Sequence, residues 1–250
     1  MAHVEAGLRS YNPDMPEEIN RILTDRVATL LLCPTHTAVD NLHREGFPFP
    51  TPQRGKQRIE QVGDVMYDAV LHYRDRARKC VSLATWGLTD QGYALCTLHR
   101  QENTDDPARL SAILAALRDI ARELPVVLPL HPRTRRKLEQ HGALALLDRL
   151  RVIDPLPYLE MQRLQMSARL ILTDSGCMQK EAYFHGVPCI TLRDETEWME
   201  TVDAGWNRLT GANQARIVGA FPAAGAGKQS QAHFPYGDGC AAGRILDCLA

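Results

Sequence analysis

The sequence lacks a charge surplus, a long apolar run and an export leader. Its 29 Lys and Arg residues are balanced by 30 Asp and Glu residues, and the net charge of −1 leaves no basic field to hold nucleic acid or an anionic membrane. The longest run of mainly apolar residues, 27–33, is far too short to span a bilayer. No positively charged leader with an apolar core precedes it, so the sequence indicates neither export nor a membrane partner.

Paired cysteine motifs are missing as well. The seven cysteines are odd in number, scattered along the chain and never spaced as Cys-x-x-Cys. This usage fits reduced thiols in a cytoplasmic protein and argues against a structural zinc site or a disulfide framework. Ordinary proportions of charged residues (24%) and hydrophobic residues (44%) in a chain of 250 predict one large or two small globular domains.

The sequence does contain a regular alternation of strand and helix patterns. Compact apolar runs predict strands at 28–33, 58–64, 93–98, 126–130, 151–153, 170–173 and 189–192. Helical patterns are found at 35–45, 65–79, 107–123, 133–140, 158–167, 178–185 and 239–249, and one more helix begins at Pro16. Repeated β–α–β units with short apolar strands predict an α/β fold with a parallel sheet covered on both faces.

The helical stretch over 65–79 is long enough to bridge two lobes. We therefore expect the back half of a first lobe in 1–75, a second lobe in 76–235, and a terminal helix in 236–250 that packs toward the first lobe. The stretch 221–230 is rich in glycine and alanine, which predicts a flexible loop.

Polar clusters follow four of the predicted strands. In a doubly wound sheet, ligands bind beyond the carboxyl ends of the strands, so these clusters are candidates for a site. They comprise His99, Arg100, Glu102 and Asn103 after the first strand; His131 after the second; Asp174, Ser175, Gly176, Cys177, Gln179 and Glu181 after the third; and Arg193 and Glu197 after the fourth. The two histidines do not have metal-ligand spacing, which argues against a metal site, and each can equally hydrogen-bond a neighbouring loop.

The turn over 174–177 predicts a specific kind of ligand. Small residues run straight into a helix start there, which leaves free backbone N–H groups with the helix dipole behind them. Such a turn binds phosphate or diphosphate, and Glu181, about one helical turn further on, can accept hydrogen bonds from two sugar hydroxyls. The alternative is that Asp174 or Ser175 only caps the helix.

Glu5 and Glu17 are candidate proton carriers near the start of the chain. Glu5 follows a short strand pattern and is followed by a glycine at position 7, an awkward place for a carboxylate without a purpose. Paired carboxylates in a cleft suit the removal and return of a proton. The alternative is that Glu5 pairs with Arg9 and that Glu17 favours the dipole of its helix.

Five ordered segments carry a family resemblance: 3–10, 16–21, 99–103, 173–182 and 236–239. Together they resemble the non-hydrolysing UDP-N-acetylglucosamine 2-epimerase family, and they are spread over nearly the whole chain. A further stretch, 192–202 followed by 205–207, looks closer to members that act on UDP-2,3-diacetamido-glucuronate-type sugars.

The resemblance implies a glycosyltransferase-B-like fold of two Rossmann-like lobes, with a nucleotide sugar held between them. It implies epimerisation at C2 of a UDP-N-acetyl amino sugar by elimination and re-addition of UDP, for the synthesis of cell-surface polysaccharide precursors. No redox cofactor and no essential metal is implied, and the full-length form is expected to be a homodimer.

The resemblance also assigns roles to residues. By motif match, Glu5 and Glu17 serve proton transfer and His99 faces the departing diphosphate. The expected substrate-binding residues are Arg100, Glu102, Asn103, His131, Leu156, Met161, Ser175, Gly176, Cys177, Gln179, Glu181, Arg193 and Glu197. Among these, the turn over 175–177 offers N–H groups to phosphate, Glu181 holds the ribose, and the segment 156–161 flanks uracil.

The sequence departs from the family pattern in three places. Cys177 stands where the family usually has a second glycine, and Trp198 stands where many members have arginine. The Gly-Thr-Arg-Pro-Glu motif of the family's N-terminus is absent, so we expect an N-terminally truncated chain whose incomplete first lobe exposes a sheet edge. Two alternative functions stay open: a UDP-sugar-binding fragment without catalysis, and a related glycosyltransferase-B-type transferase, although the Glu5 and Glu17 motifs speak against the transferase.

Overall fold

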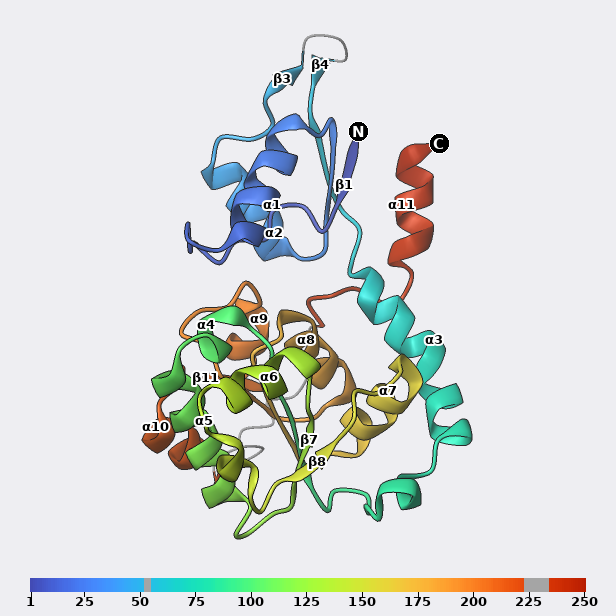
Figure 1. Ribbon diagram of the computed structural model, residues 1–250. Helices are drawn as coiled ribbons and strands as arrows, with labels where there is room; N and C mark the ends of the chain where they lie inside the picture. Colours follow the sequence, from blue (N-terminus) through green and yellow to red (C-terminus); the bar gives the residue numbers. More distant parts are fainter. Residues whose placement is uncertain (52–54, 223–233) are drawn as a thin grey trace. The chain divides into compact units, whose positions relative to one another are not determined.

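The computed structural model describes residues 1–51, 55–222 and 234–250 (Figure 1). The chain divides into two compact units, Met1–His72 with Gln231–Ala250, and Tyr73–Ser230. Both units have an α/β fold with parallel sheets, which confirms the predicted fold class. None of the helices in the described residues combines the length and apolar character needed to cross a membrane.

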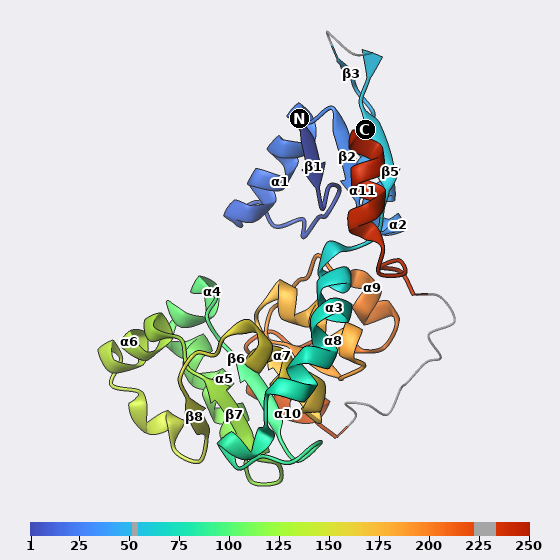
Figure 2. The same cartoon turned by 90° about the vertical axis from the view of Figure 1, so that its right-hand side faces the viewer.

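The first unit is built on a three-stranded parallel sheet with the order β1–β2–β5. Its strands are β1 (Ala2–Val4), β2 (Leu30–Cys33) and β5 (Arg58–Gln61), and its helices include α1 (Pro16–Val27), α2 (His36–Arg44) and α11 (Ala241–Leu249). Ile245 and Cys248 of α11 pack against a small core of Leu30, Leu32 and Val62. In Figure 2, α11 lies beside this sheet, so a helix from the end of the sequence packs against strands from its beginning.

The second unit contains a six-stranded parallel sheet with the order β11–β10–β9–β6–β7–β8. The strands are β6 (Ala94–Thr97), β7 (Val126–Pro129), β8 (Arg151–Ile153), β9 (Leu170–Thr173), β10 (Cys189–Thr191) and β11 (Asn207–Leu209). The helices between and after them are α4 (Gln101–Thr104), α5 (Pro107–Ile120), α6 (Pro132–Gln140), α7 (Tyr158–Ser167), α8 (Gly176–His185), α9 (Met199–Asp203) and α10 (Gln214–Ala220). Helix α3 (Val65–Cys80) contains the boundary between the units, and two short 3₁₀ helices, η1 (Leu83–Trp86) and η2 (Leu144–Leu147), complete the unit.

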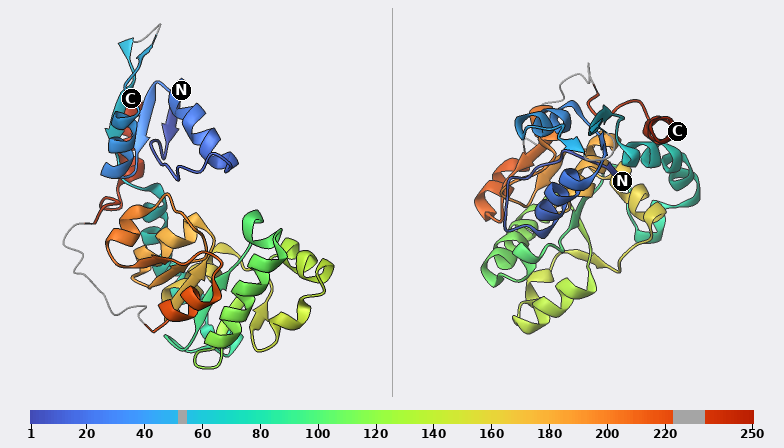
Figure 3. Two further views of the ribbon diagram at one scale, coloured as in Figure 1. Left: turned by 90° about the vertical axis from the view of Figure 1, so that its left-hand side faces the viewer. Right: turned by 90° about the horizontal axis from the view of Figure 1, so that it is seen from above.

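The four central strands of this sheet, β10, β9, β6 and β7, are buried on both faces, which explains why they appear in the sequence as continuous apolar runs. Successive residues of β6 point to opposite sides: Ala94 and Cys96 join one core with α5 and α10, whereas Leu95 joins a second core with α7 and α8. Figure 3 shows the helices of this unit on either face of its sheet. This two-sided packing holds the carboxyl ends of the strands, and the loops that follow them, in fixed register.

The structure also contains elements that the sequence patterns did not indicate. Helices α4, α9 and α10 and strand β11 are short, and their apolar residues are too few to show a period. The proline-rich stretch after α2 holds a short antiparallel pair, β3 (Pro50–Thr51) with β4 (Gly55–Lys56). The glycine- and alanine-rich stretch predicted as a loop, 221–230, lies outside the described residues from position 223 onward.

Candidate functional site

The polar clusters of the second unit meet at the carboxyl edge of its sheet. Thr97 of β6 and Thr191 of β10 are both register partners of Thr173 in the central strand β9. The hydroxyls of Thr97 and Thr173 share a hydrogen bond of 2.6 Å. Parallel pairing thus brings the loops after three strands to one place, as the sequence predicted.

Asp174 ties two of these loops together. Its fully buried carboxylate accepts hydrogen bonds from the backbone N–H groups of His99, at 3.1 and 3.2 Å, and Arg100, at 2.9 Å. The side-chain amide of Asn103 donates to it at 3.3 Å, and His99 Nδ1 lies 3.3 Å from Oδ1. Asp174 therefore anchors the loop that carries His99, whose side chain is 43% exposed and available to a ligand.

Ser175, rather than Asp174, is the N-cap of α8. Its hydroxyl accepts from the backbone N–H of Met178, at 3.5 Å. The capping interpretation of this serine is therefore correct, and it is compatible with anion binding because one hydroxyl satisfies only one N–H group of the first turn. Cys177 is exposed on this turn, so its side chain does not block access.

Gly176 allows a carboxylate to approach the start of α8. A Cβ at this position would lie 2.7 Å from Glu197 Oε1 and 3.1 Å from Trp198 Nε1, so any larger residue would displace both side chains. A carboxylate near the N-terminus of a helix is favourable because the dipole is positive there. The same negative charge repels a phosphate, so Glu197 suits hydroxyl groups better than phosphate oxygens.

Arg193 balances the negative charge around Glu197. The buried guanidinium lies 3.1 Å from Glu197 Oε2, 3.5 Å from Glu102 Oε1 and 3.9 Å from Glu195 Oε1. Burial raises the pKa of Glu102, and Arg193 opposes that rise. Arg193 is surrounded by carboxylates, so it positions acidic groups at the site.

Glu181 lies one turn into α8 and is held by two glutamines of α7. Gln162 Nε2 donates to Oε1 and Gln165 Nε2 donates to Oε2, each at 2.7 Å. Burial raises the pKa of Glu181, while the two amides and the charge of Lys180 oppose the rise. Each oxygen accepts one amide hydrogen and keeps acceptor capacity for a hydroxyl.

His185 extends this network at the end of α8. Its Nε2 lies 2.7 Å from Gln162 Oε1. Burial lowers the pKa of His185 to about 4, and the charges of Arg74 and Arg78 on α3 add to the decrease. The imidazole is therefore neutral at pH 7.

We expect the second unit to lose stability as the pH falls below 6.5, because His185 binds a proton near 6.5 when unfolded but only near 4 when folded. Its contribution is complete above pH 6.5, and about 2 kcal/mol of unfolding free energy is lost by pH 5. Urea unfolding at pH 7 and pH 5 measures this loss. His185→Gln does not titrate, so its stability should fall by about 2 kcal/mol less over the same range; equal decreases in both proteins would contradict the assignment.

Other predicted binding residues have structural partners. Asn103 and Gln179 are fully buried. Asn103 donates to the carbonyl of Leu192 at 2.9 Å, and Gln179 Oε1 accepts from Thr196 at 2.6 Å, so each holds a loop of the site.

The remaining predicted residues lie around the site. His131 is exposed and caps α6, because its Nδ1 accepts from the backbone N–H of Arg133 at 3.2 Å. Leu156 and Met161 are half-buried and pack against the core beneath α7 and α8, which leaves part of each surface for a flat apolar ligand. In the described residues no three His, Cys, Asp or Glu side chains gather as a metal-binding group.

In the first unit, Glu5 follows β1 in a strained conformation. Its φ of 66° lies in the left-handed region, which costs a non-glycine residue about 1 kcal/mol and is typical of functional positions. Gly7 is required by the same turn, because its φ is 79° and a Cβ there would lie 2.2 Å from the carbonyl oxygen of Ala38. The turn therefore presents a half-buried carboxylate on a rigid backbone.

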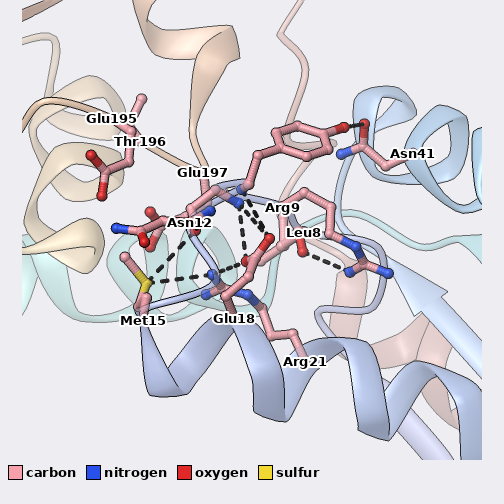
Figure 4. Close-up of polar contacts among 12 residues, drawn as sticks. Leu8, Arg9, Asn12, Met15, Glu18, Arg21, Asn41, Glu195, Thr196 and Glu197 are labelled. Atoms are coloured by element: carbon pink, nitrogen blue, oxygen red, sulfur yellow. Dashed lines mark hydrogen bonds and ion pairs between the residues drawn. The ribbon is translucent and has the colours of Figure 1, made fainter.

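Glu17 and Glu18, adjacent in α1, have opposite surroundings. Glu17 is exposed in the first turn, whereas Glu18 is buried and accepts from the backbone N–H groups of Ser10 and Tyr11 at 2.9–3.1 Å (Figure 4). Arg21 donates to Glu18 at 2.6 Å. Burial opposes ionisation, but Arg21 and the two amides lower the pKa of Glu18. Glu18 is therefore a structural carboxylate, whereas Glu17 lies exposed beside it.

Asp25 is the buried centre of the turn that carries Glu5. It accepts from the backbone N–H of Gly7 at 3.2 Å and from Arg9 Nη1 at 2.8 Å, and it lies 2.6 Å from His3 Nδ1. Arg9 also forms a two-point ion pair with Glu45, at 2.6 and 2.8 Å. Burial works to lower the pKa of Arg9, but Glu45 and Asp25 raise it well above its ordinary value.

Sequence reasoning missed several side chains that support the site. Two glutamines three residues apart on the otherwise apolar side of a helix, at 162 and 165, were a usable signal for a buried polar partner. Lys180 is fully buried with its Nζ 3.9 Å from the ring centre of Trp198, a cation–π contact that no local pattern indicates. Asp25 also lacked a signal, because its partners come from other parts of the chain.

Comparison with known proteins identifies relatives that match this chain over all of its 250 residues. A model of the family described as UDP-N-acetylglucosamine 2-epimerase matches residues 1–250. The chain is 50% identical over 252 residues to the UDP-2,3-diacetamido-2,3-dideoxy-D-glucuronate 2-epimerase of Pseudomonas aeruginosa, a match that covers 100% of this chain and 68% of the relative.

Solved structures are similar as well. The crystal structure of the Methanocaldococcus jannaschii UDP-GlcNAc 2-epimerase in complex with UDP-GlcNAc and UDP matches with a TM-score of 0.88 and 38% identity, over 99% of this chain and 68% of that one. The Neisseria meningitidis UDP-GlcNAc 2-epimerase bound to UDP-GlcNAc matches with a TM-score of 0.84 and 29% identity, over 99% of this chain and 69% of that one.

Proposed function

Because the chain belongs to the UDP-N-acetylglucosamine 2-epimerase family, a family of isomerases with a glycosyltransferase-B-like fold, we propose that it inverts the configuration at C2 of a UDP-N-acetyl amino sugar. The observation that carries the proposal is the start of α8: the helix begins at Gly176 directly after the Ser175 cap, and one helical turn later a carboxylate is held in place by two amides. A nucleoside diphosphate has the matching chemistry, with a diphosphate next to a ribose diol.

The proposed reaction moves one proton and breaks one bond. A carboxylate removes the C2 proton while the C1–O bond breaks, and the electron pair of that bond leaves with UDP. The resulting glycal-like intermediate accepts UDP again at C1 as a proton reaches C2 from the opposite face. We assign proton transfer to Glu5 and Glu17 and the stabilisation of the leaving diphosphate to His99.

We propose that the second unit binds the UDP moiety. The start of α8, over Ser175, Gly176 and Cys177, faces the diphosphate with the positive end of the helix dipole, and Glu181 accepts the two ribose hydroxyls. The backbone N–H of Ser175 already donates to Thr173 Oγ1 at 2.9 Å, so it is not assigned to phosphate. Arg193 holds Glu197 beside the same turn, so we assign Glu197 to hydroxyl groups of the sugar. Leu156 and Met161 offer an apolar surface to uracil.

The choice of sugar has two candidates. The Pseudomonas aeruginosa relative, at 50% identity, favours a UDP-2,3-diacetamido-2,3-dideoxy-glucuronate, and the two solved structures favour UDP-GlcNAc. Both sugars carry an acetamido group at C2, so the proton chemistry is the same for each. We also propose a homodimer for the full-length form and a cytoplasmic location. The seven cysteines are all among the described residues and form no disulfide, as is usual for cytoplasmic proteins.

Incubation with each nucleotide sugar in deuterated water tests the function. We expect the preferred substrate to gain deuterium at C2 and to form its C2 epimer, because the proton is exchanged before it is returned. Nuclear magnetic resonance of the sugar reports both changes. Binding of UDP without any exchange, for either sugar, would leave only a UDP-sugar-binding protein.

Glu181→Ala is expected to weaken UDP binding about 10- to 100-fold, because hydrogen bonds to a charged group contribute about 1.5–3 kcal/mol. Glu181→Gln keeps the volume of the side chain but loses the charge, so its loss of UDP affinity should be smaller than that of Glu181→Ala. Isothermal titration calorimetry measures both, with the exposed Glu139→Ala as the control. Unchanged affinity of Glu181→Ala would remove the ribose assignment.

A further inference from the structure

We propose that His185 is a positioning residue for nucleotide binding, which acts through Gln162 to orient the carboxylate of Glu181 toward the ribose. The inference rests on the proposed function, because it assumes that Glu181 accepts the ribose hydroxyls. His185 and Gln162 belong to neither the catalytic nor the binding residues named so far. They lie behind Glu181, where α7 packs against α8 (Figure 2).

The three side chains form one hydrogen-bonded chain. His185 Nε2 lies 2.7 Å from Gln162 Oε1, and Gln162 Nε2 lies 2.7 Å from Glu181 Oε1. An ionised carboxylate only accepts hydrogen bonds, so the amide must present its NH₂ group to Glu181. Its carbonyl oxygen then faces the imidazole, which must donate from Nε2.

His185 therefore sets the direction of the Gln162 amide. Without a donor at this position, Gln162 Oε1 would be a buried acceptor with no partner, and the Gln162 side chain would lose the contact that fixes its position. Its NH₂ group would then hold Glu181 Oε1 less firmly, and the carboxylate would be less well oriented. The imidazole is neutral because burial and the charges of Arg74 and Arg78 disfavour its protonated form, so it has a single N–H to donate.

The second glutamine provides an internal comparison. Gln165 Nε2 donates to Glu181 Oε2 at 2.7 Å, but Gln165 Oε1 has no hydrogen-bond partner among the described residues. Of the two amides, that of Gln162 alone is held by a second side chain, His185, on the side away from Glu181. With one amide on each oxygen, the remaining lone pairs of Glu181 match two hydroxyls, as a ribose diol requires.

Calorimetric titration with two nucleotides tests the proposal. The probes are UDP and 2′,3′-dideoxy-UDP, which differ only in the diol. We expect the wild-type protein to prefer UDP by about 10-fold or more, and His185→Leu to lose most of that preference while it keeps its affinity for the dideoxy nucleotide. His185→Gln places an amide N–H near the position of Nε2 and should restore most of the preference.

Gln162 provides a second route to the same test. Gln162→Glu keeps the size of the side chain but replaces the donor with an acceptor, so it should lose the preference for UDP whether or not His185→Leu folds. The double variant with Gln162→Glu and His185→Leu should lose little more of the preference for UDP than Gln162→Glu alone, because both substitutions act through the contact between Gln162 and Glu181.

Two results would overturn the proposal. An equal loss of affinity for both nucleotides in the folded variants would show a general structural role for His185. A wild-type protein that binds both nucleotides equally would remove the ribose assignment on which the inference depends. Deuterium exchange at C2 is measured separately, so a failure of this proposal remains distinguishable from a failure of the proposed function.

Discussion

Glu5→Gln is expected to reduce deuterium incorporation at C2 about 10²- to 10⁴-fold and to leave UDP affinity unchanged. Glutamine has nearly the shape of glutamate but cannot take up a proton, so the loss falls on proton transfer. Glu5 belongs to the first unit and the proposed UDP-binding residues to the second, which is why we expect the two properties to separate. The exchange rate is measured by nuclear magnetic resonance and UDP affinity by calorimetry.

Neighbouring glutamates provide the control for this experiment. Glu17→Gln should lose exchange with an unchanged unfolding midpoint, because Glu17 is exposed. Glu18→Gln should instead lower the unfolding midpoint, because the buried Glu18 carboxylate holds Arg21 and the N–H groups of Ser10 and Tyr11 (Figure 4). Persistent exchange in Glu5→Gln would refute its role as a proton carrier.

Asp25→Ala is expected to destabilise the first unit by about 3–5 kcal/mol, since removing one member of a buried ion pair leaves the other charge without compensation. Arg9 would lose one of its two carboxylates, and His3 and the N–H of Gly7 would lose their acceptor. These groups hold the turn that carries Glu5, so we expect exchange at C2 to fall together with stability. Urea unfolding followed by circular dichroism measures the loss.

Matched variants separate charge from packing at this position. Asp25→Asn keeps the volume and part of the hydrogen bonding, so its loss of unfolding free energy should be smaller than that of Asp25→Ala. The exposed Asp14→Ala, from the loop before α1, should change stability by less than about 0.5 kcal/mol. If Asp25→Ala unfolded at the same urea concentration as the wild type, the network would not stabilise the unit.

Local patterns predicted the frame of the second unit well. The strands of 93–98, 126–130 and 170–173 are present as β6, β7 and β9, because a buried parallel strand must be apolar along its whole length. The helix predicted from Met178 begins two residues earlier, at Gly176, since Ser175 provides the cap. Helix α4 was missed because its start depends on Asp174, which lies more than 70 positions along the chain.

The same limit applies to the side chains of the site. The sequence indicated Glu181 from its distance to the turn, but not the two glutamines and the histidine behind it. It placed Glu17 and Glu18 side by side, but which of the two is buried depends on how α1 packs against the segment that holds Ser10 and Tyr11. Asn103 and Gln179 were expected to bind substrate, and no local pattern indicated that both side chains are fully buried and hydrogen-bonded to neighbouring loops.

The α/β class, the positions of most strands and the turn at the start of α8 could be predicted from local patterns, because these features depend on periodicity and turn chemistry within a few residues. The motifs that identify the family are present in the sequence as well. Which polar groups support others depends instead on the tertiary structure. Those contacts join residues far apart in the chain, such as Asp174 with His99, and they form only when packing brings the elements together and excludes water from between them.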